Sequence, residues 1–293
     1  MLNSTGNSYV DDIAYYDGLG RPFEFVQKVA KNGTKTGSPM ATLQEYDALG
    51  RETNTWLPIK TTTDYLTPAT FKSNAPGNYN NDAYPYSQTS YDDSPLNRIN
   101  TLYGPGNAWH NGWHTIDLDH TFNSASSPLH CIKYSVNSTG GLVKAGNYAA
   151  GLLHVVKTTD EDDNVSYTFT DEQGHVLLER RMNGKEPHDT YYVYNDLGNL
   201  CFVLQPMYQK SGSLEKHAFQ YQYDNLNRCV RKVLPGCLYI KYVYDNADRM
   251  TFSQDGNQRT KGLWTYYLYD KLGRFTEQGE CVDKNTSSGG KTV

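Results

Sequence analysis

The fold is decided by one stretch of the sequence, Phe219-Gln-Tyr-Gln-Tyr-Asp-Asn-Leu-Asn-Arg-Cys-Val-Arg-Lys-Val233. Its first half alternates aromatic and polar residues, which places Phe219, Tyr221 and Tyr223 on one face of a β-strand. The alternation stops at residues 224–227, where Asp and Asn favour a turn because their side chains hydrogen-bond the local backbone and tolerate left-handed dihedral angles. A second strand is predicted from Arg228, so the whole stretch is one β-hairpin.

The same hairpin pattern occurs eight times in the chain, which makes it an internal repeat. Besides the stretch above, it is found at residues 16–21, 46–51, 91–98, 169–175, 194–199, 244–249 and 269–274. Repeats with a period of roughly 20–50 residues indicate a fold built by stacking one small unit. A lone hairpin is only marginally stable in water, so the copies are expected to pair with one another.

Each position of the repeat has a physical role. The aromatic residue ends the incoming strand and packs across the sheet, and the leucine is expected to fold back onto the apolar face. The acidic residue begins the turn by accepting from backbone N–H groups, and the arginine after the turn can pair with it. The predicted turn acids are Asp17, Asp47, Asp224, Asp245 and Asp270. A positive φ, which suits glycine, is expected before the arginine position, at Gly20, Gly50, Gly198 and Gly273.

The pattern Tyr-Asp-x-Leu-Gly-Arg resembles the YD repeat of the RHS/teneurin family over residues 14–281. Three segments also resemble the opening module of RHS-repeat proteins of the Bacteroides type: Tyr-Tyr-Asp-Gly-Leu-Gly-Arg-Pro at 15–22, Ser-Pro-Leu-Asn-Arg at 94–98 and Gly-Pro-Gly-Asn-Ala-Trp at 104–109. The resemblance implies a β-strip that coils into a hollow shell around a secreted toxin or other C-terminal cargo. It further implies that this chain is a fragment of a longer polypeptide, extracellular or at the cell surface.

Composition favours an all-β fold, an antiparallel strip of repeated hairpins in a curved sheet. The 293 residues include 25 Tyr, a residue enriched in strands, and strong helix-forming runs are absent. Only 37% of the residues are hydrophobic and the mean hydropathy is −0.71, which favours a thin sheet with an aromatic face over one deep core. The net charge of −5, with no cluster of Lys and Arg, argues against a nucleic-acid partner.

Four segments are predicted along the chain. Residues 1–108 form an N-terminal RHS-type module with three divergent hairpins and a Pro-rich insertion, in which residues 67–72 are expected to form a short helical turn. Residues 109–150 are expected to be an irregular connection that contains Trp and His, with one alternating strand at residues 116–122. Residues 151–282 form the regular strip, and residues 283–293 a disordered Ser/Gly-rich tail.

The sequence indicates neither a membrane span nor a disulfide framework. No apolar run approaches the ~18 residues that a spanning helix needs, and the N-terminus lacks the pattern of a signal peptide. The five cysteines are odd in number and have no C-x-x-C spacing, which argues against a zinc site as well.

A second regularity appears in the later repeats, where another aromatic residue stands two positions before the repeat aromatic. Period two puts both rings on one face, so neighbouring strands would carry a ladder of rings. The main interpretation is that this ladder is the core. The alternative is an exposed platform that stacks on sugar rings or binds a protein, with Tyr192, Tyr221, Tyr242, Tyr267, Trp109 and Trp113 as candidate ligand residues.

Catalytic motifs are not evident, and no cofactor is expected. The densest group of metal-type residues is His110, His114 and His120 with Asp117 and Asp119, which leaves open a metal-dependent enzyme centred on residues 109–120. Residues 160–164 carry alternating oxygens, as calcium loops do, but lack the Gly and distant Glu of an EF-hand, so an acidic hairpin turn is expected.

The function predicted from the sequence is therefore a non-enzymatic structural segment of an RHS/YD-repeat protein. An Asp-Pro motif of the kind that releases cargo in RHS proteins is absent from these 293 residues, so self-cleavage is not expected within them. The partners implied are the rest of a longer RHS polypeptide and its cargo, with glycans or a surface protein as alternatives. Exposed strand edges also predict self-association of the isolated chain.

Overall fold

The computed structural model describes residues 9–31, 34–35, 38–112 and 114–282. Over these residues the chain is antiparallel β-sheet with a few short helices, as the repeat pattern predicts. It folds as two compact units. Unit 1 comprises the chain up to Asp119 together with Lys157–Val165, and unit 2 comprises His120–Val156 together with the chain from Ser166 onward. The predicted tail at 283–293 and Trp113 lie outside the described residues.

Unit 1 is a sheet in which strands mostly pair with their sequence neighbours. Its strands are β1 (Tyr9–Tyr16), β2 (Pro22–Lys31), β3 (Thr34–Lys35), β4 (Met40–Tyr46), β5 (Glu52–Trp56), β6 (Ile59–Lys60), β7 (Tyr86–Tyr91), β8 (Ile99–Tyr103) and the beginning of β9 (Thr115–Phe122). The antiparallel pairs are β1–β2, β2–β3, β2–β4, β4–β5, β4–β6, β5–β7, β7–β8 and β8–β9.

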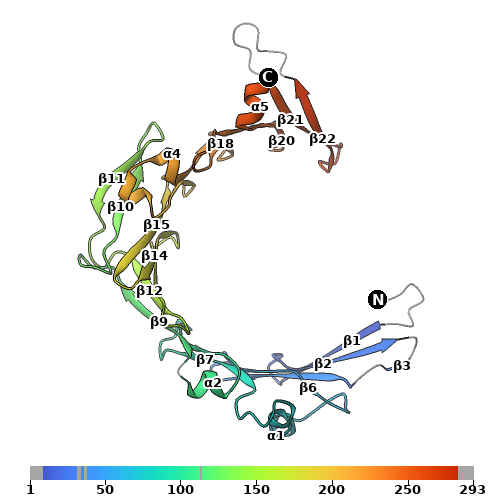
Figure 1. The fold of residues 1–293 in the computed structure, drawn as a ribbon. Helices are drawn as coiled ribbons and strands as arrows, with labels where there is room; N and C mark the ends of the chain where they lie inside the picture. The colour runs from blue at the N-terminus through green and yellow to red at the C-terminus, as the bar shows by residue number, and fades with distance from the viewer. Residues whose placement is uncertain (1–8, 32–33, 36–37, 113, 283–293) are drawn as a thin grey trace. The chain divides into compact units, whose positions relative to one another are not determined.

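A helix that the sequence did not predict in full completes the core of unit 1. Helix α1 (Pro68–Asn78) begins at Thr67, whose hydroxyl accepts from the Thr70 N–H, and Pro68 occupies a first-turn position where no amide proton is needed. Figure 1 shows α1 next to the sheet of unit 1. Its Phe71 and Ala75 are buried against Val26, Ala41, Leu43, Trp56 and Ile59. The expected short turn within a Pro-rich insertion is therefore corrected to an eleven-residue helix that covers one sheet face.

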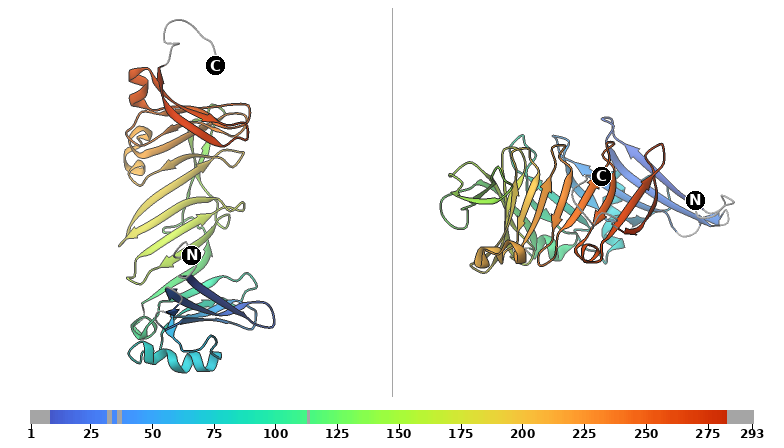
Figure 2. Two further views of the ribbon diagram at one scale, coloured as in Figure 1. Left: turned by 90° about the vertical axis from the view of Figure 1, so that its right-hand side faces the viewer. Right: turned by 90° about the horizontal axis from the view of Figure 1, so that it is seen from above.

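Unit 2 is a meander of successive hairpins. Its main strands are β13 (Val165–Thr170), β14 (Val176–Asn183), β15 (Glu186–Tyr194), β16 (Leu200–Leu204), β17 (Ala218–Tyr223), β18 (Cys229–Val233), β19 (Ile240–Tyr244), β20 (Met250–Gln254), β21 (Leu263–Tyr269) and β22 (Phe275–Val282). Each pairs antiparallel with the next. Figure 2 shows these strands side by side in a single layer.

All repeat turns of this sheet in unit 2 lie at the same end of the strands, because consecutive antiparallel strands alternate in direction. The other connections lie at the opposite end of the strands. These include helices α3 (Tyr208–Ser211) and α4 (Leu214–His217) between β16 and β17, and α5 (Gly256–Lys261) between β20 and β21.

The predicted irregular connection needs correction for its secondary structure. The alternating strand expected at residues 116–122 is present as β9. Residues 109–150 also contain most of helix α2 (Asn107–Asn111) and a separate two-stranded sheet of β10 (Ile132–Val136) and β11 (Leu142–Asn147). The predicted segment boundaries at residues 108, 150 and 282 remain predictions. Among the helices of the described residues, none combines the length and apolar character that a membrane span requires.

Candidate functional site

Every repeat hairpin is closed by a turn built around one carboxylate or amide side chain. In the turn at Asp224, one carboxylate oxygen accepts from the backbone N–H groups of Leu226 (2.9 Å) and Arg228 (3.0 Å). The Asn227 N–H donates to the Asp224 carbonyl, and Asn227 has φ of 60°. The bonds from the Arg228 backbone and guanidinium lower the pKa of Asp224. This is a three-residue hairpin loop with a left-handed third residue.

The same geometry recurs in both units. The side chain of the first turn residue accepts from the second and fourth following amides at Asp17, Asp47, Asn137, Asp160, Asp171, Asn195, Asp245 and Asp270. The left-handed position has φ of 79°, 83°, 77° and 78° at Gly20, Gly50, Gly198 and Gly273. The turn at Asp160 is the expected acidic hairpin turn. The turn at Asn137 was missed because Val136 stands where the repeat has an aromatic residue.

The repeat tyrosine binds backward, to the hairpin that precedes it. The Tyr244 hydroxyl donates to the carbonyl of Cys229 at 2.9 Å, the residue directly after Arg228. Five further tyrosines donate to the carbonyl at this same position of the preceding repeat: Tyr46 to Pro22, Tyr91 to Glu52, Tyr194 to Val176, Tyr223 to Leu200 and Tyr269 to Met250. The tyrosine is therefore a contact between repeats as well as the end of a strand.

The repeat arginine serves two turns at once. Arg228 Nε donates to Asp224 Oδ2 at 2.7 Å, and its Nη1 reaches the Asp245 carbonyl of the next turn at 3.0 Å. Its guanidinium carbon also lies 5.1 Å from the centre of the Tyr244 ring. Arginine over the next tyrosine recurs for Arg21–Tyr46, Arg51–Tyr91 and Arg249–Tyr269, and the His175 ring stacks on Tyr194. The predicted Asp–Arg pair is present, and the arginine in addition joins neighbouring repeats.

The leucines of the turns do not fold back onto the sheet, which corrects the sequence prediction. Their exposed fractions are 79% for Leu19, 73% for Leu49, 71% for Leu197, 65% for Leu226 and 79% for Leu272. The cause is the turn itself, because the acidic side chain binds the leucine N–H and fixes the leucine at the tip of the hairpin.

The four ladder tyrosines that are candidate ligand residues are half-buried. Tyr192, Tyr221, Tyr242 and Tyr267 are all intermediate in exposure. Burial raises the pKa of Tyr192 to about 12, helped by its hydrogen bond to Glu179 at 3.0 Å, and burial likewise raises the pKa of Tyr221 and Tyr242. Two earlier members of the ladder, Tyr167 and Phe169, are buried. The ladder is thus core at β13 and half-buried in the later repeats, and a role in ligand binding remains a prediction.

The aromatic and histidine side chains around α2 pack against one another. His110 stacks between Tyr84 and Tyr103, with ring centres 4.5 and 5.1 Å away. Trp109, 37% exposed, meets His114 edge-on at 5.7 Å. Among the described residues, no three His, Cys, Asp or Glu side chains are placed to hold a metal ion together. The histidines of residues 109–120 therefore do not converge on Asp119.

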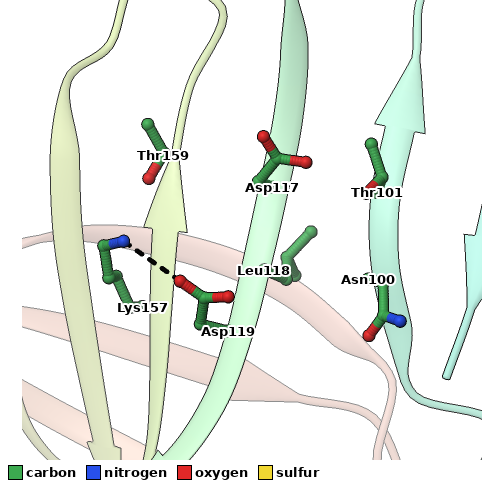
Figure 3. Close-up of a pocket in the computed structure, with 7 residues that line it drawn as sticks. All are labelled: Asn100, Thr101, Asp117, Leu118, Asp119, Lys157 and Thr159. Carbon is green, nitrogen blue, oxygen red and sulfur yellow. Dashed lines mark hydrogen bonds and ion pairs between the residues drawn. The ribbon is translucent and has the colours of Figure 1, made fainter.

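A cavity of about 460 Å³ lies in unit 1 beside β8, β9 and β12 (His154–Thr159) (Figure 3). It is lined by Asn100, Thr101, Asp117, Leu118, Asp119, Lys157 and Thr159. Lys157 Nζ forms an ion pair with Asp119 Oδ2 at 3.0 Å, and Asp117 accepts from the Thr115 hydroxyl at 3.0 Å. These groups can hydrogen-bond a polar solute, but the lining has neither a thiol nor an imidazole that could act as a nucleophile or base near neutral pH.

A buried ion pair in unit 2 escaped the sequence analysis. Arg180, 1% exposed, donates to both carboxylate oxygens of Asp189 at 2.7 and 2.6 Å and also to the His130 carbonyl at 3.1 Å. It therefore fastens the segment before β10 to the β14–β15 hairpin. The pairing follows from the two-residue loop Gly184-Lys185, which places Asn183 opposite Glu186 and Arg180 opposite Asp189. The usual hairpin with Asn183 and Gly184 as its central residues would instead place Arg180 opposite Pro187, so the sequence pattern did not indicate this pair.

The sequence analysis did not identify a buried carboxyl group in unit 1 either. Glu24 is fully buried on β2, where one oxygen accepts from the Leu66 N–H at 2.9 Å. The other oxygen has no hydrogen-bond partner among the described residues. Burial raises the pKa of this carboxyl above its usual value, which favours the neutral acid.

Comparison with known proteins identifies relatives of the fold. Residues 1–122 match a family described as a domain of unknown function, DUF6443. A crystal structure of TcdB2-TccC3-TEV matches 94% of this chain with a TM-score of 0.60 and 14% identity. The Photorhabdus luminescens Tc holotoxin pore with a TccC3 mutation matches 96%, with a TM-score of 0.61 and 14% identity. No curated protein matches the sequence.

The chain spans 13% of the length of the two solved chains. At 14% identity, the likeness shows a common arrangement of strands. It agrees with the resemblance to RHS-type repeats that the Tyr-Asp-x-Leu-Gly-Arg pattern carries.

Proposed function

We propose that this chain is a non-enzymatic structural segment of an RHS/YD-repeat protein of the Bacteroides type. In a longer polypeptide it forms part of a β-shell or cell-surface scaffold that encloses or presents a C-terminal toxin or other cargo. The supporting observation is the joint between repeats, where the tyrosine side chain binds the preceding hairpin and the arginine side chain reaches the next one. The fold shared with the TcdB2-TccC3 structures supports the same role.

The proposal is tested on the natural polypeptide in its source cells. An antibody raised against this chain is expected to detect a longer polypeptide, in the medium or at the cell surface. Limited proteolysis of that purified polypeptide should leave the cargo region intact while the strip is folded. A variant that opens a joint, Tyr223→Ala, should expose the cargo region to cleavage. Detection of a product no longer than this chain, or equal cleavage of both proteins, would contradict the proposal.

The half-buried tyrosine ladder favours a second candidate, a module that binds carbohydrate through its ring faces. Aromatic residues that keep part of a ring accessible can stack on sugars, and Tyr221 and Tyr242 retain such exposure. A glycan array probed with the wild-type chain tests this. Specific binding that is lost in Tyr221→Ala and Tyr242→Ala, while circular dichroism shows both to be folded, would support the module. Absence of binding by the wild-type chain would exclude it for the glycans on the array.

Self-association of the isolated chain is part of the proposal. Strands β1 and β22 each pair with one strand only among the described residues, so each offers unpaired backbone groups. Light scattering over a range of protein concentrations is expected to show a rising average mass. A constant monomer mass up to high concentration would count against it.

A further inference from the structure

The joints between repeats share one register. At each joint, the third residue after the arginine position pairs with the third residue before the next repeat tyrosine. The pairs are Glu24↔Leu43, Asn54↔Gln88, Leu178↔Tyr191, Phe202↔Gln220, Arg231↔Lys241 and Phe252↔Tyr266. The register is constant because the tyrosine hydroxyl and the arginine side chain fix the two strands of a joint relative to the repeat turns.

Strand β22 presents one half of such a joint. The Arg274 side chain is 75% exposed, although it forms the usual pair with Asp270 at 2.6 Å. The arginines of the turns at Asp17, Asp47, Asp224 and Asp245 are only 17–35% exposed, because the next tyrosine covers them. Phe275, whose carbonyl stands where the next tyrosine would donate, is 56% exposed. Arg274 and Phe275 thus repeat the geometry of Arg228 and Cys229, but without a following tyrosine ring over the arginine.

The shared register states what a strand bound at this edge must carry. A tyrosine at the repeat position would lie over Arg274 and donate to the Phe275 carbonyl. The residue three positions earlier would stand opposite Glu277, which is exposed, as is Glu280 on the same strand. Opposite charges that face each other across a strand pair are stabilising, and like charges are destabilising. A basic residue is therefore favoured opposite Glu277.

The first strand of a second copy does not meet this requirement. In the shared register Ile13 would stand opposite Glu277. Asp12 is the neighbour of Ile13 on β1, and Asp11 would lie diagonally across from Glu277. Two carboxylates would then approach those of β22. Strand β19, in contrast, has Lys241 three residues before Tyr244. A hairpin of the β19–β20 type fits the edge of β22, whereas β1 does not.

We propose that the edge of β22 binds, in antiparallel pairing, the incoming strand of a further repeat hairpin that has tyrosine at the repeat position and a basic residue three positions before it. This inference rests on the proposed scaffold function and names a partner of the strip. The Arg274 side chain and the Phe275 carbonyl receive the tyrosine, and Glu277 selects the basic residue.

The test uses a fluorescein-labelled peptide of residues 239–254 and the full chain, with binding followed by fluorescence anisotropy. Saturable binding is expected, since an extended peptide can add a strand to an exposed edge. The Tyr244→Phe and Lys241→Glu peptides should each bind about fivefold or more weakly, as loss of roughly 1 kcal/mol implies. The Arg274→Gln protein should lose a similar factor for the wild-type peptide.

The matched control is Arg181→Gln, which removes an exposed arginine away from β22 and is expected to leave binding unchanged. Circular dichroism checks that both protein variants are folded. The proposal is overturned if the wild-type peptide does not bind, or if binding is insensitive to Arg274→Gln or to Lys241→Glu. Such a result would leave the scaffold function to its own test, which measures polypeptide length and cargo protection.

Discussion

The repeat tyrosine contributes through its hydroxyl as well as its ring. In Tyr244→Phe the ring remains next to Arg228, but the hydrogen bond to the Cys229 carbonyl is lost. We expect the free energy of unfolding to fall by about 1 kcal/mol, the usual net value of one hydrogen bond. Urea denaturation measures it. Tyr16→Phe is the control, because Tyr16 stands at the same repeat position and is 61% exposed. An equal loss in both variants would show that the joint is not the cause.

Glu24 makes the stability of unit 1 depend on pH. Its pKa is raised in the folded protein above the usual 4.5, so the stability associated with its neutral form is present below pH 4.5 and is lost as the pH rises through the folded pKa. Glu24→Gln keeps an acceptor for the Leu66 N–H and cannot ionise.

The variant is therefore expected to gain stability over the wild type as the pH rises from 4 to 8. Urea midpoints measured across that range test this expectation, with Glu52→Gln, at an exposed site on β5, as the matched control. A difference for Glu24→Gln that does not change with pH would mean that folding does not shift the pKa of this carboxyl.

At the scale of the element, the turn depends on the acceptor more than on the charge. Asp224→Ala removes the acceptor of the Leu226 and Arg228 N–H groups, and we expect the thermal midpoint to fall by about 2–4 °C. Asp224→Asn keeps that acceptor, as the natural turn at Asn195 does, and its thermal midpoint should fall less. Differential scanning calorimetry compares the two. If both variants lose the same amount, the ion pair with Arg228 would be the main contribution.

The hairpins could be predicted from sequence because their information is local. Asp, Gly and alternating aromatics specify a turn and two strand faces within about 15 residues, and the structure confirms the antiparallel hairpin fold that they indicate. The prediction that the turn leucines fold back onto the sheet was wrong because it considered their hydrophobicity and not the hydrogen bond that holds Leu226 at the tip of the hairpin. Helix α1 was predicted too short because it contains Pro76 and Gly77, two residues of low helix propensity. The burial of Phe71 and Ala75 outweighs that low propensity.

The role of the candidate platform could not be predicted for a different reason. The period-two pattern places Tyr221 and Tyr242 on a face, but the extent to which a face is covered depends on distant elements. Likewise, the pair of Arg180 with Asp189 follows from the turn at Gly184, whereas its burial depends on the segment that ends at His130. Local pattern specifies pairing, and tertiary packing decides exposure.

At the scale of the whole molecule, the pairing pattern predicts how stability is distributed in unit 2. Each strand from β14 to β21 pairs with its two sequence neighbours, whereas β22 pairs only with β21 among the described residues. Repeat proteins of this kind have stabilities that sum over units and nearest-neighbour joints. Amide hydrogen exchange is expected to be slowest in the middle strands and to become faster toward β22.

Tyr269→Ala tests whether these joints act one by one. It removes the hydrogen bond to the Met250 carbonyl and the ring beside Arg249, both at the joint between β20 and β21. Amides of β21 and β22 should then exchange faster while those of β14–β16 keep their rates, because no contact of Tyr269 reaches them. Tyr223→Ala, at the joint between β16 and β17, should accelerate exchange on both sides of the break. A uniform acceleration in both variants would show instead that unit 2 opens as one cooperative body, and that the strip is more than the sum of its joints.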